Sequence, residues 1–275
     1  MHSLPILVIG ATGKTGRRVA DRLEAEGHAV RRASRSSPTR FDWDEPDTWT
    51  RALQGISAVY INYYPDLAFP DVPAKIQKLT DMAAAVGVER LVMLAGRGEP
   101  RAEACEEIVR RSNLDYTLVR AAWFAQNFSE GFLYDAVTEG MLALPAGGVA
   151  EPLVDIDDVA EVVAAALIDP RHARQEYDVT GPRLLSFHDA TEEMSRATGW
   201  TVAYQPISLE QFHAALIELD GPLLADVFTE VCRQIFDGRN ARLGDGVQRA
   251  LGRKPRDFAA FCAQATAVGA WNRAA

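Results

Sequence analysis

The segment Pro5-Ile-Leu-Val-Ile-Gly10-Ala-Thr-Gly13-Lys-Thr-Gly16 decides the fold of this chain. Its apolar run over residues 6–9 predicts a short buried strand, and a helical pattern of apolar residues begins at Lys14 and continues through Leu23. A strand that turns directly into a helix leaves backbone N–H groups exposed at the positive end of the helix dipole. Such a helix N-terminus is a binding site for a pyrophosphate.

Three glycines with the spacing G-x-x-G-x-x-G lie between this strand and this helix. Gly10 suits the tight turn, Gly13 lets a ligand approach the backbone, and Gly16 lets the helix pack on the strand. A glycine triplet alone is a weak signal, whereas one placed between a strand and a helix is typical of dinucleotide-binding proteins. We therefore expect a dinucleotide that contacts Gly10, Thr12, Gly13, Lys14, Thr15 and Gly16.

The composition limits the class of protein. The 275 residues, 48% of them hydrophobic, suffice for one large α/β domain with a smaller lobe. The net charge of -9 disfavours binding to nucleic acid, and no apolar run is long enough to cross a membrane. Residues 1–5 leave no room for a signal peptide, and the three cysteines lack metal-ligand spacing. We expect a cytoplasmic protein without a bound metal, either a monomer or a homodimer.

Strand-like and helix-like segments alternate over the first 120 residues, which predicts a parallel sheet built from right-handed crossovers. After the first strand, we predict strands at 29–33, 56–62, 90–94, 116–120 and 176–180, and helices at 14–27, 45–54, 71–86, 101–111, 124–139 and 157–167. From Leu184 onward the pattern predicts helices at 187–197, 209–219, 222–236 and 255–269. The expected fold class is α/β: a Rossmann-type, doubly wound parallel sheet over residues 1–180, with a small, mostly helical substrate lobe over residues 181–275.

Ligands of such a sheet bind at the carboxyl ends of its strands, so the residues directly after each strand are the site candidates. Ala95 and Tyr63 are expected to contact the cofactor. The catalytic candidates are Tyr63, Tyr64 and Arg97, because their side chains can donate a hydrogen bond to a substrate oxygen. A substrate is expected against Tyr64, Trp123, Phe124 and Asn127. The two tyrosines can equally shape a loop before a proline, and Phe128 and Phe132 are assigned to packing.

The segment after the second strand indicates which dinucleotide binds. NAD-selective sites place an Asp or Glu there to bind the ribose 2′-hydroxyl, whereas this chain has Ser34 and Arg35. A guanidinium beside a hydroxyl suits a 2′-phosphate through charge-assisted hydrogen bonds, so NADP(H) is the expected cofactor. Asp42 and Trp43 are expected to flank the adenine, although Trp43 can equally be a core residue. Alternatively, the arginines of this segment form surface ion pairs with the acidic residues of segment 42–47.

Several motifs together resemble the NmrA-like group of atypical short-chain dehydrogenases/reductases. They are Gly10-Ala-Thr-Gly-Lys-Thr-Gly16, Phe41-Asp-Trp-Asp44, Asp115-Tyr-Thr-Leu-Val-Arg120, Ala122-Trp-Phe-Ala-Gln-Asn-Phe128 and Thr180-Gly-Pro-Arg-Leu-Leu185. The resemblance covers nearly the whole chain and is greatest for the subgroup of the agroclavine and festuclavine dehydrogenases. It implies an NADPH-dependent reductase of secondary metabolism that acts on a C=N or conjugated C=C bond of a small apolar or aromatic molecule.

One departure from the wider superfamily bears on the chemistry. Standard short-chain dehydrogenases use a Tyr-x-x-x-Lys pair as proton donor, and the corresponding segment, residues 98–110, contains neither residue type. Ketone reduction requires a positioned acid or an oxyanion site, whereas hydride transfer to an iminium requires neither. We therefore expect an imine or iminium substrate, or an enone or quinone if a catalytic candidate binds its oxygen. Two alternatives are a regulatory protein that senses NADP(H) and binds a protein partner, and a non-redox enzyme of natural-product assembly.

Overall fold

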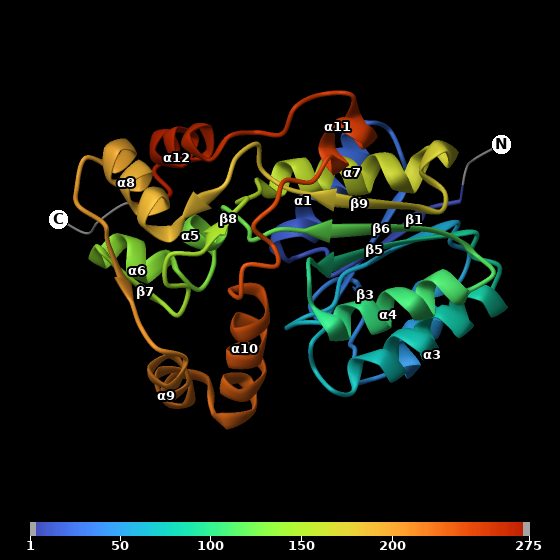
Figure 1. The fold of residues 1–275 in the computed structure, drawn as a ribbon. Coiled ribbons are helices and arrows are strands. Elements are labelled where there is room, and N and C mark those ends of the chain that lie inside the picture. The colour runs from blue at the N-terminus through green and yellow to red at the C-terminus, as the bar shows by residue number, and fades with distance from the viewer. Residues whose placement is uncertain (1–3, 272–275) are drawn as a thin grey trace.

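The computed structural model describes residues 4–271, and its core is a seven-stranded sheet in the order β3-β2-β1-β4-β5-β6-β9 (Figure 1). All pairs of neighbouring strands in this sheet are parallel. The strands are β1 (Ile6–Ile9), β2 (Val30–Ser34), β3 (Thr39–Arg40), β4 (Ala58–Ile61), β5 (Arg90–Gly96), β6 (Asp115–Ala121) and β9 (Gln175–Val179). The direction of winding reverses between β1 and β4, which places the ligand crevice at the carboxyl ends of these strands. The predicted Rossmann-type α/β fold is confirmed.

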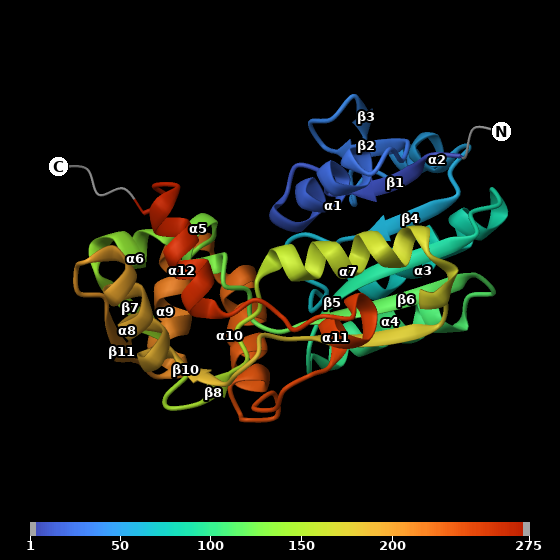
Figure 2. The same cartoon turned by 90° about the horizontal axis from the view of Figure 1, so that it is seen from above.

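Helices cover both faces of the sheet (Figures 1 and 2). One face carries α1 (Lys14–Ala25), α7 (Ile156–Ile168) and α11 (Gly246–Leu251), and the other carries α2 (Asp47–Leu53), α3 (Val72–Ala85) and α4 (Pro100–Arg111). Residues of β1 alternate between the two cores: Leu7 and Ile9 pack on the α3 side, and Ile6 and Val8 on the α7 side. The strand is buried on both faces, which is why it is apolar throughout.

The remaining elements form a second lobe at the carboxyl end of the sheet (Figure 2). Its helices are α5 (Asn127–Glu130), α6 (Tyr134–Glu139), α8 (Phe187–Thr198), α9 (Leu209–Asp220), α10 (Pro222–Ile235) and α12 (Phe258–Ala267). Two small sheets join distant parts of the chain: β7 (Met141–Leu144) pairs in parallel with β11 (Ala203–Pro206), and β8 (Ala150–Glu151) pairs antiparallel with β10 (Leu185–Ser186). Each sheet combines one strand from before residue 180 with one from after it. The division of the chain at residue 180 stays a prediction.

Two expectations about the aromatic segment after β6 are wrong. The single helix predicted over 124–139 is two helices, α5 and α6, separated by Gly131. A Cβ at Gly131 would lie 2.8 Å from the Cα of Asn127, so the tight turn between these helices requires glycine. Phe132, which we assigned to packing, is 64% exposed because it lies in this turn.

The glycine-rich turn after β1 has the geometry that its sequence predicts. Gly10 has a φ of 70°, a left-handed conformation that glycine adopts without strain. A Cβ at Gly16 would lie 2.2 Å from the carbonyl oxygen of Gly10, so α1 can approach the end of β1 this closely only with glycine at position 16. Among the described residues, no helix is both long and apolar enough to span a membrane.

This close approach predicts a large loss of stability for Gly16→Ala. The added methyl group meets backbone atoms that cannot move without displacing α1, and overpacking of this kind costs about 1–3 kcal/mol in the free energy of unfolding. Gly148→Ala is the matched control, because a Cβ at Gly148 meets no atom within 4 Å. Urea denaturation measures both changes, and equal stability of the two variants would contradict the packing assigned to Gly16.

Candidate active site

The phosphate loop is supported from β4 and presents an uncompensated helix end. Asn62, directly after β4, donates a hydrogen bond from Nδ2 to the Oγ1 of the buried Thr15 over 3.1 Å. The N-cap of α1 is Gly13, and no acidic residue lies in the first turn of the helix. The positive end of the α1 dipole is therefore not neutralised by its own side chains, which suits a phosphate group.

Lys14 and Asn127, predicted for cofactor and substrate respectively, lie together at this helix end. Lys14 donates from Nζ to the Oδ1 of Asn127 over 2.7 Å. Burial lowers the pKa of the Lys14 ammonium. The positive charges of Arg17 and Arg18 lower it further, whereas the carboxylate of Glu130 raises it. Arg18 pairs with Glu130 at 2.6 Å, which ties α1 to the beginning of the second lobe.

The loop after β2 presents a cation beside ordered hydroxyl groups. The Oγ of Ser34 accepts hydrogen bonds from the backbone N–H groups of Ser36 at 3.2 Å and Ser37 at 3.0 Å, which shapes the loop around Arg35. Within residues 4–271, the exposed Arg35 forms no hydrogen bond or ion pair, and its guanidinium lies 5.9 Å from the ring centre of Tyr64. By contrast, Arg32 pairs with Asp21 and Glu24, and the acidic segment is paired by Arg40. Arg35 is therefore available to an anionic ligand.

An aromatic cluster lies beside this loop. The ring centre of Trp43 lies 5.0 Å from that of Phe41, 5.6 Å from that of Trp49 and 4.9 Å from that of Tyr63. The hydroxyl of Tyr63 accepts a hydrogen bond from the Nζ of Lys75 at 3.2 Å. This Tyr–Lys contact was not predicted, because its members are far apart in the sequence. Tyr63 and Tyr64 thus lie with Trp43 and Arg35, the residues expected around the adenosine.

The predicted substrate residues separate into two groups. Trp123, just after β6, contacts three rings: Phe236 at 5.3 Å, Phe187 at 5.5 Å and Phe132 at 5.9 Å. Its indole N–H is buried and has no partner among the described residues. Phe124 packs instead against the core on the α7 side, so the structure does not bring it together with Trp123.

Arg97 is held within the fold. Its Nη1 donates to the carbonyl oxygens of Asn240 at 3.1 Å and Arg242 at 2.9 Å, and its Nε pairs with Asp178 at 3.3 Å. Burial lowers the pKa of this guanidinium. The Nη2 atom has no hydrogen-bond partner among the described residues. Arg97 stays a catalytic candidate because this atom could donate to a substrate oxygen. Ala95 is buried near the end of β5.

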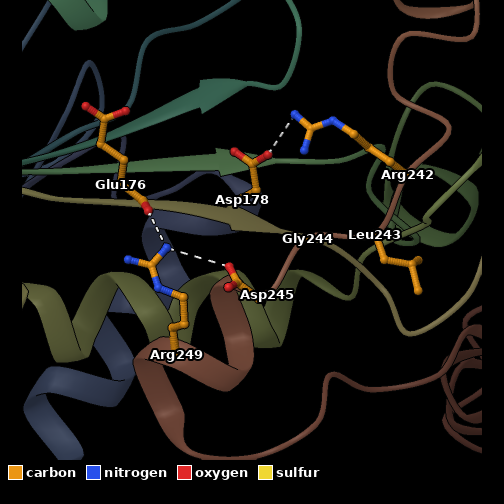
Figure 3. A pocket seen from close by; sticks show the side chains of 7 residues that line it. All are labelled: Glu176, Asp178, Arg242, Leu243, Gly244, Asp245 and Arg249. Atoms are coloured by element: carbon orange, nitrogen blue, oxygen red, sulfur yellow. Dashed lines mark hydrogen bonds and ion pairs between the residues drawn. The ribbon is translucent and has the colours of Figure 1, made fainter.

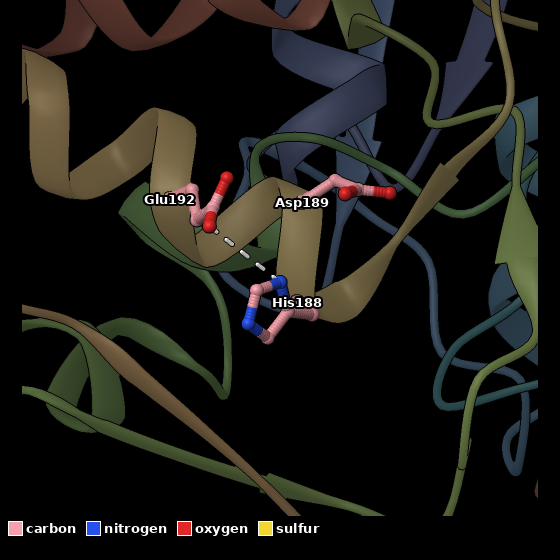
Figure 4. Close-up of side chains that lie close together, drawn as sticks. All are labelled: His188, Asp189 and Glu192. Atoms are coloured by element: carbon pink, nitrogen blue, oxygen red, sulfur yellow. Dashed lines mark ion pairs between the residues drawn. The ribbon is translucent and has the colours of Figure 1, made fainter.

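Two other polar groupings contain none of the predicted site residues, although the first of them borders Arg97 through Asp178. A pocket of about 570 Å³ beside β9 and α11 is lined by charges that are already paired, including Arg242 with Asp178 at 3.1 Å and Arg249 with Asp245 at 3.6 Å (Figure 3). The exposed side chains of His188, Asp189 and Glu192 lie together at the start of α8 (Figure 4). The carboxylate of Asp189 accepts hydrogen bonds from Ser186 and completes a capping box, which explains its position there.

Sequence reasoning missed three carboxyl groups near the lobe, of which Glu99 and Glu151 are buried and Asp66 is half-buried. Asp66 and Glu99 follow β4 and β5, and Glu151 lies in β8. Burial raises the pKa of Glu151 to about 7, although Arg97 lowers it in part. Asp66 and Glu99 could have been found from the sequence, because each lies in the segment that follows a predicted strand. Glu151 could not, because it is enclosed by the pairing of β8 with β10, two strands that are distant in the sequence.

The pKa of Glu151 predicts a pH-dependent effect of Glu151→Gln. Because the folded-state pKa of about 7 lies above the ordinary value of 4.5, the unfolded chain loses this proton first as the pH rises. The wild type therefore loses stability between about pH 4.5 and pH 7, and Gln removes that loss. We therefore compare the unfolding free energy of the variant with that of the wild type at two pH values. Relative to the wild type, the variant should be about 1–3 kcal/mol more stable at pH 8 than it is at pH 4. Urea denaturation at both pH values measures it, and a pH-independent difference would refute the assigned pKa.

Comparison with known proteins agrees with this architecture. A family profile described as NAD(P)H-binding matches residues 10–170. The NAD(P)H azoreductase of Xenophilus azovorans is 31% identical over 96% of this chain and 99% of its own. Festuclavine synthase I of Penicillium roqueforti is 26% identical over 94% of this chain and 97% of its own. The triphenylmethane reductase of a Citrobacter species, solved with NADP(H), aligns with a TM-score of 0.73 at 20% identity, over 95% of this chain and 99% of its own.

These findings define the class of protein. The chain belongs to the NAD(P)H-binding family and is an NmrA-like atypical short-chain dehydrogenase/reductase. It is an NAD(P)-dependent oxidoreductase of that type, near the subgroup of the festuclavine and agroclavine dehydrogenases. The resemblance stated from the sequence and the expected dinucleotide are confirmed at this level.

Proposed function

We propose that this protein is an NADPH-dependent reductase that transfers hydride to a flat imine, iminium, enone or quinone. The observation that carries the proposal is the aromatic wall around Trp123 at the carboxyl end of β6, which is formed by Trp123 and three further rings. The indole N–H of Trp123 has no hydrogen-bond partner within residues 4–271. Planar conjugated molecules stack on such rings, and an N–H donor can orient a heteroatom. The name of the azoreductase and that of the triphenylmethane reductase indicate conjugated aromatic substrates for those relatives, which supports the same class here.

The cofactor residues divide into two sets along the edge of the sheet. The pyrophosphate would be bound by Gly10, Thr12, Gly13, Lys14, Thr15 and Gly16. The adenosine with its 2′-phosphate would be bound by Ser34, Arg35, Asp42, Trp43 and Tyr63. Ala95 would lie beneath the nicotinamide. When bound, NADPH supplies a hydride. The protein would orient the substrate toward the nicotinamide and exclude water from it. Two contacts bring the second lobe against this edge of the sheet: the hydrogen bond of Lys14 to Asn127 and the packing of Trp123 on Phe236.

Arg35→Asp tests the choice of nucleotide. Loss of a charge-assisted contact to the 2′-phosphate costs about 1.5–3 kcal/mol, so the Kd for NADPH should rise about 10-fold to 100-fold while the Kd for NADH changes little. Arg51→Asp, the same charge change at an exposed position of α2, is the control. Calorimetric titration with NADPH and with NADH measures both Kd values. An equal rise in the two Kd values would show that Arg35 does not bind the 2′-phosphate.

Trp123→Leu tests the substrate wall. The KM for a planar quinone or azo acceptor should rise about 10-fold, because stacking contributes roughly 0.5–1.5 kcal/mol beyond buried area, while the Kd for NADPH stays unchanged. Leu219→Ala, at a position 78% exposed on α9, is the control. The assay follows NADPH absorbance with enone, quinone, azo and iminium acceptors. Binding of NADPH without oxidation by any acceptor would instead favour the sensor of NADP(H), and activity that survives removal of the cofactor would favour the non-redox enzyme.

A further inference from the structure

A pair of neighbouring carboxyl groups lies where the two lobes meet, and the proposed function does not use it. Glu99, the N-cap of α4, is 7% exposed. Burial raises the pKa of its carboxyl group, and the closeness of the half-buried Asp66 raises it further. Asp66 accepts a hydrogen bond at Oδ1 from the backbone N–H of Ala68 over 2.8 Å. Two neighbouring carboxyl groups disfavour each other's ionisation, so this pair favours a state in which one proton is held between them.

The position of Glu99 puts this proton at the ligand edge of the sheet. A Cβ on Gly96 would lie 1.9 Å from the Oε1 of Glu99, so the carboxyl group lies directly against the last residue of β5. Gly96 is in register with Ala121 at the end of β6, two residues before Trp123. The second carboxyl oxygen, Oε2, is buried and has no partner among the described residues.

Helix α10 places Glu99 close to the aromatic wall. Cys232 lies near enough to Glu99 for that carboxyl group to raise the thiol pKa, and Phe236 packs on Trp123 at 5.3 Å. Positions 232 and 236 are one helical turn apart on the same face, so Glu99 and Trp123 border neighbouring parts of one surface. The buried hydroxyl of Thr229, also without a partner among the described residues, lies one turn earlier on α10.

We propose that Glu99, which shares a proton with Asp66, is the general acid of the reaction, and that the preferred substrate is therefore an enone or quinone rather than an iminium. The inference rests on the proposed hydride transfer. A hydride adds to the electrophilic carbon of the conjugated system, and the electron pair that it displaces moves to the oxygen. Glu99 then gives its proton to that oxygen and becomes a carboxylate, which water reprotonates after the product leaves. An iminium becomes a neutral amine on hydride addition and has no use for this proton.

The surroundings keep this proton in place at neutral pH. Burial, with Asp66 adding to it, raises the pKa of Glu99 well above its ordinary value, and burial also raises that of Asp66. The ionisable groups that face the pair are Cys232 from α10 and Cys105 from α4, and burial raises the pKa of each thiol to about 12. Two guanidinium groups lie close to the pair: that of Arg101 donates to the carbonyl oxygen of Ala68, and that of Arg239 to the carbonyl oxygen of Gly98. Among the described residues, neither forms an ion pair with Asp66 or Glu99, and Arg239 is paired with Asp237.

Glu99→Gln tests the proposal, with Glu103→Gln as control because Glu103 is exposed on the same helix. We expect kcat for a quinone to fall by about 10²-fold or more in Glu99→Gln, as general acids contribute on that scale, with an unchanged Kd for NADPH. In the wild type, kcat for the quinone should show a solvent isotope effect and should fall at high pH, and both features should be absent from Glu99→Gln. The kcat for any iminium substrate should be the same in the variant as in the wild type. A kcat for quinone within threefold of the wild type would overturn the assignment.

A readout that needs no turnover separates this inference from the proposed function. The infrared difference spectrum at pH 7 with NADP⁺, wild type minus Glu99→Gln, should contain the band of a buried protonated carboxyl group, whereas wild type minus Glu103→Gln should not. The subtraction removes the contribution of Glu151, whose pKa is about 7. Absence of the band from the first difference spectrum would refute the protonated Glu99 even in an active reductase. Conversely, a protein that shows the band but does not oxidise NADPH with any of the acceptors would overturn the proposed function, and the role of Glu99 with it. If Glu99→Gln does not fold, Asp66→Asn gives the same decision, because loss of its partner should shift the band of Glu99.

Discussion

The close approach of α1 to the end of β1 is the constraint on which the site depends. Gly16 lies against the carbonyl of Gly10 at a distance that excludes any Cβ, and Gly10 turns the chain with a positive φ. Together they aim the N-terminus of α1 at the crevice where the winding of the sheet reverses. Asn62 supports the same loop from the next strand of the sheet through Thr15. The position of this helix N-terminus, where we propose that the pyrophosphate binds, is thus set by backbone geometry.

The second lobe adds the features that distinguish this protein from a nucleotide-binding sheet alone. It is connected to α1 through Lys14 and Asn127, to β6 through Trp123 and Phe236, and to the end of β5 through Arg97 and the backbone of Asn240 and Arg242. These contacts enclose polar atoms of Arg97, Glu99, Trp123, Glu151 and Thr229 that have no partner among the described residues. Unpaired polar groups in a buried interface cost free energy, and a polar ligand that pairs with them recovers it. The cost is therefore consistent with a binding surface.

The sequence predicted what depends on local pattern. Apart from β3 and α11, which were missed, the strands and helices of the main sheet follow from periodicity, and so do the glycine turn and the placement of Ser34 and Arg35 after the second strand. The strands β7 and β11 were missed because each is short and gains its stability from a partner distant in sequence. The same limit applies to the site. Tyr63 and Tyr64 were assigned from their position after β4, but only the fold shows that Trp43 and Arg35 are their neighbours. The missing Tyr-x-x-x-Lys pair argued for a site without an acid, whereas folding brings Asp66 and Glu99 together from two loops.

Every role proposed above requires that the loop after β1 bind an adenine dinucleotide. The most direct measurement is a calorimetric titration of the purified, cofactor-free protein with NADPH. We expect saturable binding of one NADPH per chain with a Kd on the order of micromolar, about 8 kcal/mol of binding free energy. No heat of binding from a folded protein at millimolar NADPH would contradict it.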